Sequence, residues 1–228
     1  MENSKSYQHY NKNPKEGEMT IGWQKMKENF LVFFLMVLLA GVLEIPMGAI
    51  DDIVEENSFS IGIAFLQVFG FAYWLFLLPV FQYGIDLIFL RGIRNENPEV
   101  KDVTIGFNNY VNIVLANLLK FGLVAIALVA LIIPGIVVAC RLAFVSYLVM
   151  DKGLNPIEAV EQSWKMTSGR GWHIFGLYLA AIFICIGGLL LFIVGIFPAL
   201  MWISSYMAVY YQMTLDELAT DDIEDTLE

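Results

Sequence analysis

Residues 121–150 read FGLVAIALVALIIPGIVVACRLAFVSYLVM, and this stretch decides the fold class. It holds a single charged residue, Arg141, and a Pro134-Gly135 pair near its centre. A helix needs about 20 mostly apolar residues to cross roughly 30 Å of hydrocarbon. Because proline interrupts a helix, the stretch predicts the end of one membrane-spanning helix, a tight turn at Pro134-Gly135, and the whole of the next helix.

The composition of the whole chain agrees with this reading. The 228 residues are 58% hydrophobic and 16% charged, and the mean hydropathy is +0.65. Soluble globular proteins contain roughly 25% charged residues. The net charge of −10 comes mainly from the Asp51–Glu56 patch and from the tail after Asp216, so a basic surface for nucleic acid is not expected.

Long apolar runs predict an all-α integral membrane bundle of about six transmembrane helices, arranged as three hairpins. These helices form a single domain, residues 29–212, between a polar N-terminal arm (1–28) and an acidic tail (213–228). The expected spans are residues 29–45, 61–90, 110–133, 136–150, 172–194 and 198–212.

A weak internal repeat favours the pairing into hairpins. A glycine-aromatic step precedes each odd-numbered span, at Gly22-Trp23, Gly106-Phe107 and Gly171-Trp172. A proline follows at a similar distance, as Pro46, Pro134 and Pro198. The aromatic is expected at the membrane interface, and the proline should end one helix or open the next. Common ancestry of the three units and independent recurrence of useful residues both account for the pattern.

The basic residues predict the orientation. Lysine and arginine occur in the N-terminal arm and in the connections after the second and fourth spans, whereas the connections after the first, third and fifth spans contain none. Positively charged loops stay in the cytoplasm. Both termini are therefore expected on the cytoplasmic side.

The connection between the fourth and fifth spans predicts a short amphipathic helix at residues 155–168. Asn155 suits the N-cap, Pro156 the first helical position, and Glu158 completes a capping box, while Gly169 can end the helix. It is expected to lie along the cytoplasmic interface or to pack as a connector on the bundle. A second cap, Thr214 with Glu217, predicts a separate short helix in the tail.

No motif for catalysis or for phosphate binding is present, and neither Cys140 nor Cys185 has a ligand-like spacing. We therefore expect a non-enzymatic protein without a metal or cofactor.

Three ionisable residues inside the apolar runs are candidates for a functional or structural role. Asp86 is expected to pair with Arg91 or Arg94, or to face a cytoplasmic cavity. Arg141, about 10 Å from Pro134 at 1.5 Å per residue, is expected to point outward and pair with Glu44. The alternative is that Arg141 binds an anionic lipid headgroup or substrate.

Around Ile133-Pro134-Gly135 the chain resembles a bacterial family of multi-pass membrane proteins of unknown function, related to the membrane domain of glycerophosphodiester phosphodiesterases. The resemblance covers roughly residues 75–212. Its elements are Gly84, Arg91-Gly92, Gly106-Phe107, Ile133-Pro134-Gly135, Asp151, Asn155-Pro156-Ile157-Glu158-Ala159, Ser163, Gly169 and Trp172. It implies a six-helix fold in a bacterial cytoplasmic membrane. It does not imply phosphodiesterase activity, because no hydrolase domain accompanies these residues.

These observations favour a protein of the lipid bilayer that binds a partner protein or a lipid. The alternative is a small transporter or export accessory subunit with a polar path between its helices. The two differ in one respect: a transporter should have a cavity that reaches Asp86 or Arg141, and an adaptor should be packed with apolar side chains throughout.

Overall fold

The computed structural model describes residues 17–56, 60–190 and 195–227, and this part of the chain is helical without strands. Most of it is α-helix; one π-helical segment (η2) and one 3-10 helix (η3) complete the set. In chain order the elements are α1 (Glu18–Glu28), α2 (Phe30–Glu56), α3 (Ile61–Ala72), η2 (Tyr73–Leu77), α4 (Leu78–Ile93), η3 (Val100–Asn109), α5 (Tyr110–Ala130), α6 (Ile132–Arg141), α7 (Val145–Asp151), α8 (Pro156–Met166), α9 (Gly171–Leu190) and α10 (Ile196–Leu227).

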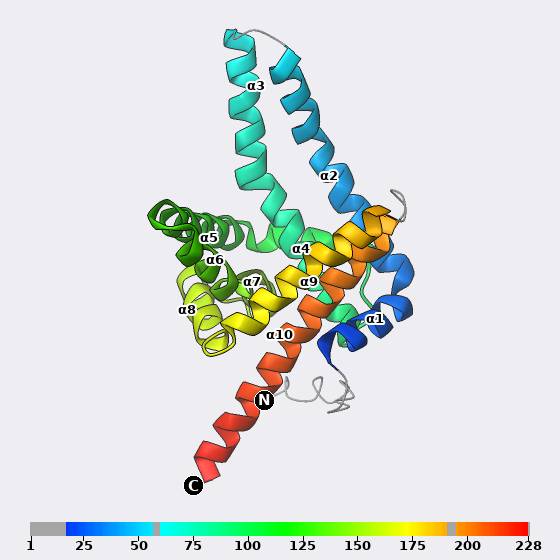
Figure 1. The fold of residues 1–228 in the computed structure, drawn as a ribbon, viewed down its shortest axis with the longest axis vertical. Helices are drawn as coiled ribbons and strands as arrows, with labels where there is room; N and C mark the ends of the chain where they lie inside the picture. The colour runs from blue at the N-terminus through cyan, green and yellow to red at the C-terminus, as the bar shows by residue number, and fades with distance from the viewer. Residues whose placement is uncertain (1–16, 57–59, 191–194, 228) are drawn as a thin grey trace.

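Three helical hairpins diverge from a shared base, as Figure 1 shows. They are α2 with α3, α5 with α6, and α9 with α10. Each hairpin is preceded in the chain by a short helix: α1, η3 and α8 respectively. We call the end of the molecule formed by α1, η3, α7 and α8 the base. The repeated glycine-aromatic steps lie in the short helices α1 and η3 of the first two units, whereas the third lies at the start of α9 itself, so the repeat in the sequence matches equivalent positions in two of the three units.

The chain is an all-α membrane bundle. Five segments of its described part are long and apolar enough to cross a membrane: Phe30–Val54, Ile61–Ile93, Val100–Val129, Ile132–Asp151 and Gly171–Leu190. The predicted sixth span, 198–212, lies inside α10. Residues 198–212 are less apolar than the other spans because they include serine, tyrosine and glutamine side chains, and the part of α10 that follows them is acidic.

Several predicted helix boundaries were wrong. Pro46 does not end the first span, since α2 continues through it to Glu56. The fourth span is not one helix but two, α6 and α7, separated by a turn at 142–144. No separate helix begins at Thr214, because α10 runs unbroken through the acidic tail. The buried Thr214 hydroxyl donates a hydrogen bond to the Tyr210 carbonyl, which lets threonine remain inside a helix.

The π-helical turn η2 has a local cause in the sequence. Pro79 has no N–H, and its ring would clash with the carbonyl four residues earlier in a regular α-helix. The N–H of Leu78 instead donates to the Tyr73 carbonyl, five residues back. The wider turn accommodates the proline and lets α3 continue into α4.

The core lies mainly at the base, where helices approach closely at glycines. A Cβ atom at Gly84 would lie 2.3 Å from the Val103 carbonyl oxygen, and one at Gly106 would lie 2.6 Å from that of Val80. Both contacts join α4 to η3. On the opposite side α1 packs on α10, where the rings of Trp23 and Trp202 lie 5.2 Å apart. The walls of the hairpins expose many large apolar side chains, as expected for a surface in contact with lipid.

Candidate functional site

A cavity of about 500 Å³ lies between α6 and α9. Most of its lining is apolar, and Arg141 is the one charged residue in it. The lining residues are Ile133, Ile136, Val137, Cys140, Arg141, Gly169, Gly171, Trp172 and Phe175. Ile133, Ile136, Val137 and Trp172 are also exposed at the surface, so the cavity is open on the apolar side of the molecule. Its volume falls within the usual range for small-molecule sites.

Arg141 is held in place by α8. It is the last residue of α6, and the chain turns immediately after it. Its backbone carbonyl accepts hydrogen bonds from the hydroxyls of Ser163, at 2.8 Å, and Thr167, at 3.2 Å. Both hydroxyl residues are fully buried. Ser163 also accepts a hydrogen bond from the Phe144 N–H at 3.2 Å, so one side chain of α8 fixes both sides of the turn.

The guanidinium of Arg141 lacks an acidic partner in the described part of the chain. Its Cζ atom lies 5.5 Å from the centre of the Trp164 ring, a cation–π contact. Nη1 and the Tyr83 hydroxyl are the buried side-chain polar atoms without a hydrogen-bond partner there. A buried donor of a charged group without a hydrogen-bond partner is destabilising. An anion in the cavity would remove much of that cost.

The entrance beside Arg141 is kept open by glycines. Gly169 has φ +75°, a conformation that other residues rarely adopt, and it ends the turn after α8. Gly171 begins α9, and a Cβ atom at either glycine would meet no atom within 4 Å. Trp172, 86% exposed, flanks this opening. Tryptophan is a residue type enriched where the headgroups of a bilayer meet the hydrocarbon.

The predicted pair between Arg141 and Glu44 is wrong. Arg141 forms no ion pair among the described residues, and Glu44 is an exposed residue of α2. The prediction counted depth along a single upright helix that began at Pro134. In the structure α6 ends at Arg141 itself and α8 packs against that end. Arg141 therefore lies beside the helix that the sequence assigned to the other side of the membrane.

Asp86 is also placed differently from the prediction. It lies close to the Ser146 side chain and within electrostatic range of Lys120 on α5. Arg91 instead pairs with Asp102 of η3 at 2.7 Å, and Arg94 pairs with Asp151. Arg91 is five residues after Asp86, about 140° around the helix at 3.6 residues per turn, so the two point in different directions.

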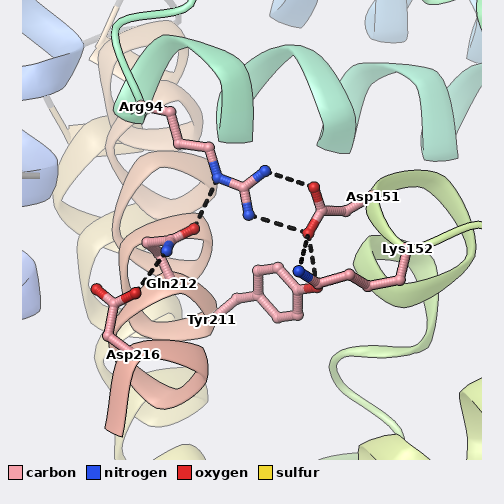
Figure 2. A network of polar contacts seen from close by, with 6 residues as sticks. All are labelled: Arg94, Asp151, Lys152, Tyr211, Gln212 and Asp216. Carbon is pink, nitrogen blue, oxygen red and sulfur yellow. Dashed lines mark hydrogen bonds and ion pairs between the residues drawn. The ribbon is translucent and has the colours of Figure 1, made fainter. Parts of the chain in front are cut away.

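A second polar cluster, which we call the clasp, joins the three hairpin units at the base (Figure 2). Arg94 follows α4, Asp151 ends α7, and Tyr211 and Gln212 belong to α10. The Arg94 guanidinium binds both carboxylate oxygens of Asp151, with Nη2 at 2.9 Å from Oδ2. Its Nε donates to Gln212 at 2.7 Å, and the Tyr211 hydroxyl donates to Asp151 at 3.1 Å.

Burial makes the clasp a strong electrostatic contact. The side chains of Arg94 and Asp151 are only 9% and 7% exposed. Burial alone would lower the pKa of the Arg94 guanidinium, but the hydrogen bonds and charge of Asp151 raise it above its usual value. Lys152 lies 3.8 Å from Asp151, and Gln212 donates to Asp216 at 2.8 Å (Figure 2). A bidentate, buried and fully hydrogen-bonded pair is typical of a structural role.

The residues that carried the family resemblance divide between the cavity, the clasp and the helix starts. Gly169 and Trp172 line the cavity, and Ser163 positions Arg141. Pro156 and Glu158 form the start of α8, where the predicted capping box with Asn155 is confirmed. Pro134 and Gly135 lie in the first turn of α6, and Asp151 belongs to the clasp. The sequence did not predict the clasp; the signal that could have found it is position, since Arg94, Asp151 and Gln212 each lie near the base end of the second helix of a unit.

Metal binding finds no support in the described part of the chain, which has no group of three or more histidine, cysteine or acidic residues close enough to hold an ion. Cys140 and Cys185 are both free thiols, and Cys140 lines the cavity beside Arg141.

Comparison with known proteins gives no family assignment. The chain matches no protein-family model, no curated protein and no solved structure. The resemblance described from the sequence therefore stays a prediction, and the functional case depends on the geometry of the cavity.

Proposed function

We propose that this protein is a non-enzymatic lipid-binding protein of the bacterial cytoplasmic membrane. The observation that carries the proposal is the cavity between α6 and α9, which is apolar along its walls, open toward the lipid-facing surface and ends at Arg141. An acyl chain fits the apolar walls, and a polar headgroup fits the end flanked by Arg141 and Trp172.

The distribution of charge supports an orientation with the base in the cytoplasm. Of the lysines and arginines that the structure describes, only Lys120 lies away from the base and the helix ends that adjoin it. Positively charged segments are retained on the cytoplasmic side. With this orientation the headgroup end of the cavity faces the cytoplasmic leaflet, and both termini are cytoplasmic.

The test is to fill the cavity and measure the lipid that stays with the purified protein. Val137→Trp places a large ring in the lining, and we expect it to lower the lipid retained per protein severalfold, as measured by mass spectrometry. Val129→Trp is the matched control, because Val129 is 89% exposed on α5 and does not line the cavity. Equal retention by the Val137→Trp variant and the unaltered protein would refute the proposal.

Transport of the bound lipid is the second candidate function, and one observation favours it. A transporter was expected to have a cavity that reaches Asp86 or Arg141, and the α6–α9 cavity reaches Arg141. The test is the movement of a fluorescent phospholipid between leaflets of proteoliposomes. Acceleration by the unaltered protein, and its loss in the Val137→Trp variant, would establish transport; binding without acceleration would leave the lipid-binding function alone.

A further inference from the structure

We propose that the ligand of the α6–α9 cavity is an anionic phospholipid whose negatively charged headgroup pairs with the guanidinium of Arg141. This inference rests on the proposed lipid-binding function and adds the chemical class of the ligand. It also assigns Arg141 as a ligand-binding residue.

The pairing of the other arginines makes Arg141 an exception. The chain contains four arginines, and the structure describes all of them. Arg91 pairs with Asp102 at 2.7 Å, Arg94 with Asp151, and Arg170 with Glu217 at 2.7 Å. Each of these three receives its counter-charge from within the protein. Arg141 receives none among the described residues, although Nη1 is buried.

The lining of the cavity explains why the headgroup should carry a net negative charge. All phospholipids contain a phosphate, but a zwitterionic headgroup also brings an ammonium group that needs an acceptor or water. The residues that line the cavity include no aspartate or glutamate. A phosphate alone is matched by Arg141, whereas an added ammonium group would be repelled by the same guanidinium and would meet no acidic partner in the lining. The site should therefore prefer phosphatidylglycerol to phosphatidylethanolamine.

The surroundings of Arg141 leave room for this contact. Gly169 and Gly171 line the cavity beside Arg141, so neither position adds a side chain that would obstruct the approach of a headgroup. Ser163 and Thr167 hold the Arg141 backbone, and Trp164 lies against the guanidinium, so the charge is fixed in position before a ligand binds. A fixed guanidinium loses less conformational entropy on binding than a mobile one. The amide groups in the first turn of α9 add a partial positive charge near Gly171.

The experiment compares two lipids with identical acyl chains in the full-length protein purified in a neutral detergent. Binding of phosphatidylglycerol and of phosphatidylethanolamine is measured by native mass spectrometry. The unaltered protein should prefer phosphatidylglycerol by about tenfold, because only phosphatidylethanolamine brings a positive charge close to the Arg141 guanidinium. Arg141→Gln should reduce the preference to about one while phosphatidylethanolamine still binds, and Arg141→Lys should retain part of it.

A matched control separates a specific contact from a change in net charge. Arg170→Gln removes the same charge near the start of α9, but Arg170 pairs with Glu217 and does not line the cavity. This variant should keep the preference for phosphatidylglycerol. If Arg170→Gln abolishes the preference as fully as Arg141→Gln does, general electrostatics accounts for it and the assignment of Arg141 is wrong.

The two proposals fail in different ways. Equal binding of both lipids by the unaltered protein would overturn the anionic-ligand inference, even if Val137→Trp still lowers retention of every lipid. No effect of Val137→Trp would overturn lipid binding in the cavity itself. If Arg141→Gln fails to fold, the inference is still tested by the preference of the unaltered protein and by Arg141→Lys, which keeps the charge.

Discussion

Arg94 and Arg141 both lie near the base of the molecule, but their guanidinium groups differ in the partners that the protein gives them. Arg94 is buried in the clasp, where Asp151 and Gln212 occupy its donors and Tyr211 supports the carboxylate. Arg141 lies beside an apolar cavity and forms a cation–π contact with Trp164 but no ion pair within the described residues. The same residue type thus has a complete set of partners in one region and an incomplete set in the other.

This difference shows how a structural charge can be told apart from a binding charge. Removing one partner of a buried ion pair destabilises the protein, because the other partner loses its counter-charge. An unpaired arginine has no internal partner to lose, so its removal should affect stability little and ligand binding strongly. The exposed fraction of an arginine does not distinguish a structural charge from a binding charge, whereas the presence or absence of an acidic partner does.

Breaking the clasp should have the largest effect on stability. Arg94→Met removes the bidentate partner of the buried Asp151 carboxylate and leaves it only Tyr211 and the more distant Lys152, so we expect a loss of about 3 kcal/mol in the free energy of unfolding. Equilibrium unfolding in mixed detergent would measure it. The double variant Arg94→Met, Asp151→Leu should recover most of the loss, since it removes both charges. If the double variant is as unstable as the single one, the charge pair is not the cause.

A substitution at Gly84 tests how much close helix packing at the base contributes to stability, for comparison with the charge pair of the clasp. Gly84→Ala would put a Cβ atom 2.3 Å from the Val103 carbonyl oxygen, so α4 and η3 must separate. We expect a cost of about 1–3 kcal/mol in the same unfolding assay. Gly176→Ala in α9 is the control, because its Cβ atom would meet nothing within 4 Å. Similar losses in both variants would argue against close packing as the reason for glycine at position 84.

Weakening α8 should loosen the side of the molecule that holds Arg141 and leave the clasp unchanged. Asn155→Ala removes the side chain that accepts hydrogen bonds from the N–H groups of Ile157 and Glu158 at the start of α8. The expected cost is about 1 kcal/mol of local stability. Hydrogen exchange should become faster at residues 156–166 and stay the same around Arg94. Unchanged exchange in α8 would mean that the cap does not limit its stability.

The smallest effect is expected at Arg141 itself. In lipid-free protein, Arg141→Met should change the free energy of unfolding by no more than about 0.5 kcal/mol, or raise it. Loss of the cation–π contact with Trp164, about 0.5–1 kcal/mol, is offset by removal of the unpaired charge. The unfolding assay used for Arg94→Met gives the direct comparison. A loss as large as that of Arg94→Met would place Arg141 among the structural charges and contradict the distinction drawn above.

Features that depend on residues close together in the chain could be predicted without the structure. Apolar runs of sufficient length predicted helical hairpins in a membrane, because backbone groups must be satisfied within each segment in hydrocarbon. The Asn155, Pro156 and Glu158 pattern predicted the start of α8, since a capping box involves only four consecutive positions. The glycine-aromatic repeat indicated three units, and the structure has a short helix before each hairpin.

Which charged residues form pairs could not be predicted in this way, because the partners come from different elements of the fold. Pairing depends on where helix ends lie, and those positions follow from features with no clear local signal: the turn at 142–144 and the direction in which each hairpin leaves the base. The turn brought Arg141 to Ser163 of α8 rather than to Glu44. The close approach of α4 and η3 at Gly84 and Gly106 gave Arg91 a partner in Asp102, and Asp86 was left facing Ser146 and Lys120. A charge inside a membrane segment can be found from sequence, but its partner is set by long-range packing.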